Sequence, residues 1–67
     1  MQSQLWFVTD GVRALSVFES KKEAERDLDR YQDDPDYEYY ECYSLDIDDL
    51  EDYPDEYELA LEEGFLR

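Results

Sequence analysis

The chain has 67 residues, and its 21 acids against six bases give a net charge of −15 at pH 7. This length predicts a single domain over residues 1–67, with a core of modest size. Because Cys42 is the only cysteine and histidine is absent, the composition excludes an internal disulfide and a Cys–His zinc site.

Two strands joined by a tight turn are predicted first. Residues 4–9 and 12–18 are rich in aromatic and β-branched side chains, which is typical of strands. The dipeptide between them, Asp10-Gly11, favours a two-residue type I′ turn that pairs Thr9 with Val12. In this register one face carries Leu5, Phe7, Val12, Ala14 and Phe18, and the other carries Trp6, Val8, Leu15 and Val17. Both faces are apolar, so we expect both to be covered.

A helix is predicted over residues 20–32. Ser20 and Glu23 form the capping-box pattern, in which a hydroxyl and a carboxylate bind free backbone N–H groups of the first turn. Pro35 ends the helical pattern, because the residue before a proline avoids the helical conformation. The expected buried stripe consists of Ala24, Leu28 and Tyr31.

Residues 37–45 are predicted to form a third strand. Its alternation places Tyr37, Tyr39, Glu41, Tyr43 and Leu45 on one face, and Tyr40 and Cys42 on the other. A hairpin, a helix and a third strand make a ββαβ unit. The preference for right-handed crossovers favours the third strand beside the first, in the order 2-1-3.

The last third of the chain predicts a short acidic helical turn over residues 46–52 and a second helix. Pro54 is typical of a first helical residue, and Gly64 with Phe65 is typical of a helix end. The expected buried stripe of this helix consists of Tyr57, Ala60 and Leu61.

The predicted fold is therefore α+β, a small single domain with a three-stranded, mostly antiparallel sheet. The capped helix covers one face and the acidic C-terminal helix covers the other, which is the face of Trp6. A second copy of the chain, making a homodimer, is the alternative cover for that face.

Charge is unevenly divided along the chain. Residues 1–32 hold six acids and five bases, whereas residues 33–67 hold fifteen acids and one base, for net charges of −1 and −14. Such asymmetry indicates an interaction surface that repels nucleic acid and anionic membranes and attracts basic proteins. The predicted partner-binding residues are Asp46, Asp48, Asp49, Glu51, Asp52, Asp55 and Glu56, together with Tyr53 and Tyr40. Tyrosine beside carboxylates suits arginine-rich partners.

Duplex DNA presents one charge per about 1.7 Å of axis, and the acidic half of this chain offers a comparable density. The expected function is inhibition of a basic, nucleic-acid-binding protein by mimicry of nucleic acid. In character the composition resembles the small acidic DNA mimics carried by phages and mobile elements, although no motif of such a family is matched residue by residue. The alternatives are an acidic adaptor that binds a basic patch without mimicry, and a salt-adapted protein. Salt adaptation would spread acids over the whole surface and does not require the tyrosines.

Catalytic and metal-binding motifs are missing from the sequence. Cys42 has no histidine to activate it, so we expect no enzyme activity. An EF-hand loop counted from Asp46 places Leu50 at a ligand position and Glu51 at the glycine position, so no calcium site is expected. No cofactor is expected either. The longest apolar run, residues 5–8, is too short to span a bilayer, which predicts a cytoplasmic protein without a membrane partner.

Overall fold

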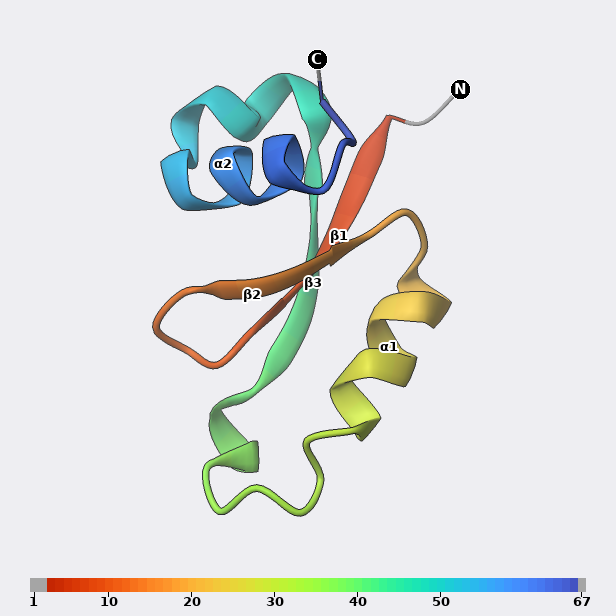
Figure 1. Ribbon diagram of the computed structural model, residues 1–67, viewed down its shortest axis with the longest axis vertical. Helices are drawn as coiled ribbons and strands as arrows, with labels where there is room; N and C mark the ends of the chain where they lie inside the picture. Colours follow the sequence, from red (N-terminus) through yellow and green to blue (C-terminus); the bar gives the residue numbers. More distant parts are fainter. Residues whose placement is uncertain (1–2, 67) are drawn as a thin grey trace.

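A three-stranded antiparallel sheet forms the centre of the computed structural model, which describes residues 3–66 (Figure 1). In chain order the elements are β1 (Gln4–Thr9), β2 (Ala14–Phe18), α1 (Lys21–Asp29), η1 (Tyr37–Tyr39), β3 (Glu41–Asp46), η2 (Ile47–Asp52) and α2 (Pro54–Glu62), where η marks a 3₁₀ helix. The strand order is β2-β1-β3, and both pairs are antiparallel. The predicted α+β class and the predicted strand order are therefore confirmed.

The hairpin loop is longer than predicted. Thr9 pairs with Ala14 instead of Val12, which leaves four residues, 10–13, in the loop. The carboxylate of Asp10 accepts a hydrogen bond from the backbone N–H of Val12 at 2.9 Å, and this bond stabilises the four-residue loop. A type I′ turn needs positive φ at both central residues, but only the glycine of the Asp10-Gly11 pair has it, at 93°.

This longer loop changes the predicted faces of β2. The register shifts between Val8 and Thr9, so Phe7 pairs with Val17 and Trp6 pairs with Phe18. Val17 therefore shares the face of Phe7, whereas Phe18 lies on the opposite face. The register predicted from the sequence was wrong on both residues, because a shift of one residue moves each side chain to the other face.

One face of the sheet packs against α2 and η2. Its buried cluster consists of Leu5, Phe7, Val17, Leu50 and Ala60. Tyr43 and Leu45 of β3 pack against this cluster, as their predicted alternation required. The C-terminal helix is therefore a sheet cover, as predicted, but it covers the face of Leu5 and Phe7 instead of the face of Trp6.

The opposite face packs against α1. Trp6 is half-buried there, and Nζ of Lys21 lies 5.9 Å from the centre of its ring. Val8 of β1 and Ala24 of α1 are fully buried. Because alternate residues of a strand point to opposite faces, Trp6 and Val8 cannot share the cover of Leu5. Deleting α2 would expose Leu5 before Trp6.

The helix α1 begins as predicted but ends earlier. The hydroxyl of Ser20 accepts the backbone N–H of Glu23 at 3.2 Å, which is the expected cap. The helix stops at Asp29 instead of residue 32, and the chain continues in tighter turns toward Pro35. Its buried residues are Ala24 and Asp27, so the predicted stripe missed the aspartate.

The third strand is shorter than predicted. Residues 37–39 form η1, and β3 begins only at Glu41, opposite Thr9 at the end of β1. Earlier residues of the predicted strand have no β1 residue left to pair with, because the chain turns away at Asp10. Tyrosine-rich sequence favours a strand, but a strand needs a partner.

The ends of α2 match the sequence, but its buried side does not. The N–H of Gly64 binds the carbonyl of Leu61 at 3.1 Å, and the N–H of Phe65 binds that of Ala60 at 2.9 Å, the expected helix end. Tyr57 and Leu61, predicted to be buried, are each 40% exposed, and Leu59 packs inward with Ala60 instead. None of the helices described within residues 3–66 is long and apolar enough to cross a membrane.

Candidate functional site

The acids of the second half form an exposed surface that bases do not neutralise. Of the fifteen acids in residues 33–66, thirteen are exposed, and Asp34 and Glu56 are half-buried. Within residues 3–66, none of these fifteen makes an ion pair with a lysine or arginine. Arg67, the only base of this half, lies outside the described residues. The surface therefore presents negative charge that is available to a partner.

The helix α1 differs in this respect. Its exposed acids are Glu23, Glu25 and Asp29, and its exposed bases are Lys21, Lys22 and Arg26, with Arg30 just beyond it. Asp27 is buried, and its carboxylate pairs with the guanidinium of Arg30 at 3.1 Å. The charge is therefore mixed on α1, whereas η2 and α2 carry acids and no bases. Arg13 of the hairpin loop lines one hollow with Asp55, Glu58 and Glu62 of α2, but within the described residues it makes no ion pair with them.

The structure brings eight of the nine predicted partner-binding residues together. Asp46 ends β3, four acids lie on η2, Tyr53 links η2 to α2, and Asp55 and Glu56 lie in the first turn of α2. These segments follow each other around one end of the sheet (Figure 1). Tyr40 precedes β3 at the opposite end, about 20 Å away along the strand. Tyr40 therefore does not belong to this surface.

The placement of η2 depends on two apolar side chains. Leu50 is 1% exposed and belongs to the core, and Ile47 packs against it from the start of η2. In a 3₁₀ helix, residues three apart lie on the same side. The N–H of Ile47 also binds the carbonyl of Ser3 at 3.0 Å. With this side fixed to the sheet, the exposed acids of η2 are Asp48, Asp49, Glu51 and Asp52.

Glu56 has a structural partner. The hydroxyl of Tyr43 donates to its carboxylate at 3.1 Å, which joins α2 to β3. Burial, and then the negative charge of Glu56, raise the pKa of Tyr43 above its ordinary value of 10.0. The phenol therefore remains a protonated donor at neutral pH. Glu56 is held by this contact and is half-buried, unlike the exposed acids beside it.

A shallow hollow on the outer side of α2 lies within this acidic surface. Its volume is about 480 Å³, and its lining consists of Glu51, Pro54, Tyr57, Glu58 and Leu61. Sequence periodicity missed this feature because it placed Tyr57 and Leu61 in the core. Exposed apolar side chains between two carboxylates suit a partner that carries apolar and basic groups together.

This surface combines exposed carboxylates with a few exposed apolar side chains. No group of three or more acidic, cysteine or histidine side chains in the described part of the chain is arranged to hold a metal ion. The long axis of the whole molecule measures 35 Å.

Comparison of the chain with protein-family models, with curated proteins and with solved structures finds no match.

Proposed function

We propose that this protein binds a basic, nucleic-acid-binding protein and competes with nucleic acid for its surface. The observation that carries the proposal is the set of thirteen exposed acids in residues 33–66 without an ion pair to a described base. A duplex 35 Å long carries about 20 phosphate charges. The protein carries a net −15 over the same length, which is the same order of density.

The cost of these charges to the fold supports the proposal. Glu62 ends α2 and Glu63 caps it, where the negative end of the helix dipole disfavours acids by about 0.3–1 kcal/mol each. Stability therefore does not explain their position. General salt adaptation explains the mixed charge of α1 poorly, because that helix is equally exposed. A localised surface for a basic partner accounts both for the mixed charge of α1 and for the acids at the end of α2.

The test begins with a partner recovered from host lysate on the immobilised protein at low salt. Duplex DNA is then added to the purified complex in increasing amounts. We expect DNA to release the partner, because both ligands would occupy one basic surface, and we expect added salt to weaken the complex. A partner that binds DNA and this protein at the same time contradicts mimicry and supports the adaptor alternative.

A matched pair of charge-reversal variants locates the surface. One variant replaces Asp48, Asp49 and Glu51 by lysine, and the other replaces Glu23, Glu25 and Asp29 by lysine. Both raise the net charge by six, and Asp27 is kept because it is buried. The first variant should lose most of its affinity, since like charges facing each other across an interface cost several kcal/mol. Equal losses in the two variants contradict a recognition surface on η2.

A further inference from the structure

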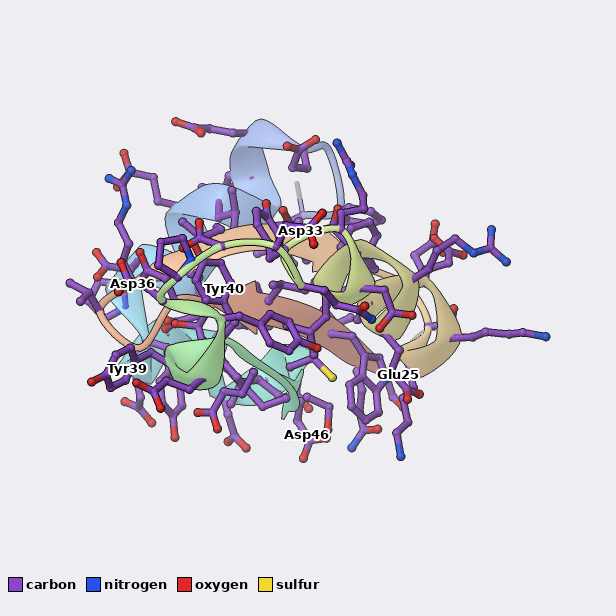
Figure 2. The ribbon with its side chains drawn as sticks, turned by 90° about the horizontal axis from the view of Figure 1, so that it is seen from below. Glu25, Asp33, Asp36, Tyr39, Tyr40 and Asp46 are labelled. Atoms are coloured by element: carbon purple, nitrogen blue, oxygen red, sulfur yellow. The ribbon has the colours of Figure 1, made fainter. Side chains whose placement is uncertain are left out.

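A second hollow lies at the tip of the β1–β2 hairpin, at the opposite end of β3 from η2. Its volume is about 400 Å³, and its lining consists of Asp10, Gly11, Val12, Asp36, Tyr39 and Tyr40. Figure 2 shows Asp36, Tyr39 and Tyr40 gathered on one side of this end of the molecule, with Glu25 and Asp46 away from them. The hollow therefore joins the hairpin loop to the segment that precedes β3.

The apolar part of this hollow is unusually open to solvent. Val12 is 88% exposed and Tyr39 is 61% exposed, and they are the two most exposed large hydrophobic side chains in the described chain. Neither residue supports the core. Exposed aromatic and aliphatic surface beside charged groups is typical of a binding site.

The walls of the hollow are held in place by hydrogen bonds and ring stacking. The Asp10 carboxylate accepts the backbone N–H groups of Val12 at 2.9 Å and of Arg13 at 3.1 Å. These bonds lower the pKa of Asp10, so it is ionised at neutral pH. The Tyr40 ring lies 4.7 Å from that of Tyr31, and its hydroxyl donates to Asp34 at 3.3 Å. These contacts fix the Asp10 carboxylate and the Tyr40 ring in the walls of the hollow.

The hairpin also approaches the opposite wall closely. A methyl group added at Gly11 would lie 3.2 Å from the carbonyl oxygen of Tyr39. The loop thus rests on the backbone of the segment that carries the exposed ring.

Charge disfavours several occupants. A second copy of this chain would bring −15 against −15, and nucleic acid would be repelled in the same way. The lining includes no lysine or arginine, and Arg13 of the same loop lines a different hollow beside α2. The Asp36 carboxylate and the exposed Tyr39 ring are therefore available to a cation from another protein, whereas the Asp10 carboxylate is held by the backbone of its own loop.

We propose that the hollow at the hairpin tip binds an arginine side chain of a basic protein segment. The flat guanidinium stacks on the Tyr39 ring and pairs with the Asp36 carboxylate, while the methylene stem contacts Val12. A lysine ammonium offers no plane for stacking and no paired N–H groups. The inference rests on the proposed function only in that the partner is a basic protein.

The test compares two fluorescein-labelled peptides, one with four arginines separated by glycines and the other with lysines in the same positions. Binding is measured by fluorescence anisotropy at one salt concentration. The arginine peptide should bind about two- to five-fold more tightly, which is the range for a cation held over an exposed ring when the guanidinium makes this contact and the ammonium does not. Tyr39→Ala and Asp36→Asn should each bring this ratio close to one. The control variant, Glu25→Gln, removes one exposed carboxylate on α1, outside both acidic surfaces, and should keep the ratio.

Amide chemical-shift changes on titration with the arginine peptide should centre on Gly11, Val12 and Tyr39. Equal affinity of the native protein for the two peptides overturns the proposal, and so does an equal loss of preference in Glu25→Gln. The assay contains neither DNA nor a nucleic-acid-binding protein. Its result is therefore independent of whether DNA releases the natural partner, and the two proposals fail separately.

Discussion

Leu50 anchors the acidic segment, and its replacement gives a sharp test of the packing. Its side chain is 1% exposed and joins Leu5, Phe7, Val17 and Ala60 in the core. Leu50→Ala removes three carbon atoms from this cluster. The transfer term alone is about 2.4 kcal/mol at about 0.8 kcal/mol per buried methylene, and the cavity adds to it. We therefore expect a loss of about 3 kcal/mol.

This loss is large for a chain of 67 residues, whose whole unfolding free energy is about 3–10 kcal/mol. The melting temperature of Leu50→Ala should fall by about 12–24 °C, at about 4–8 °C for each kcal/mol. Leu61→Ala is the matched control, because it makes the same chemical change at a side chain that is 40% exposed. Its expected loss is below about 1 kcal/mol.

Two probes distinguish global unfolding from local release of η2. Circular dichroism reports the helices, while Trp6 fluorescence reports the opposite face of the sheet, where Lys21 lies over the ring. Coincident transitions in Leu50→Ala indicate that the domain unfolds as one unit. If Leu50→Ala and Leu61→Ala melt within a few degrees of each other, Leu50 does not hold η2 to the sheet.

Three further measurements test the electrostatics. Glu62→Lys should raise the unfolding free energy in urea by about 0.3–1 kcal/mol or more, because a cation suits the end of α2, whereas Glu23→Lys at the start of α1 should lower it. Tyr43→Phe should cost about 1 kcal/mol at pH 7, since Glu56 loses its donor. Because the pKa of Tyr43 is raised in the folded protein, its hydrogen bond contributes fully to stability below pH 10.0. This contribution is lost at higher pH as the unfolded chain releases the phenol proton. The unfolding free energies of the native protein and Tyr43→Phe should therefore converge in alkaline buffer. Added sodium chloride should raise the melting temperature by screening repulsion, and a fall would contradict a crowded acidic surface.

Local chemical signals predicted much of the fold. The bounds of β1, the cap at Ser20, the proline at the start of α2 and the glycine after it all depend on residues close in sequence. The strand order followed from a general rule of chain connection. These features needed no knowledge of tertiary packing, which is why the sequence sufficed for them.

The errors have a different origin, because each involves a choice that only tertiary packing decides. Asp10-Gly11 suits a two-residue turn, but the same aspartate carboxylate can also cap a longer loop, as it does here. On α2, Ala60 can be buried together with either of two pairs of side chains. One pair is Tyr57 with Leu61, and the other is Glu56 with Leu59. In the structure the helix turns Glu56 and Leu59 toward the sheet, where Glu56 contacts Tyr43.

The candidate site was predicted in part for the same reason. Composition identified the acids of η2 and the exposed Tyr53 without any structure. It could not show that Glu56 is held by a tyrosine of β3, or that Val12 and Tyr39 line one hollow. Such pairs are distant in sequence, and no periodic pattern connects them.

The distribution of buried side chains explains how a small domain tolerates so much charge. The sheet supplies Leu5, Phe7, Val8 and Val17 to the buried apolar set, whereas η2 supplies only Leu50 and α2 only Ala60. The acidic elements are thus short segments, each attached to the sheet by one fully buried side chain, and most of their remaining surface is free for charged groups. Repulsion among these groups acts on elements that each contribute a single fully buried side chain to the core. A basic partner that neutralises them should therefore stabilise η2 and α2 more than the hairpin, and binding and local stability become coupled at this end of the sheet.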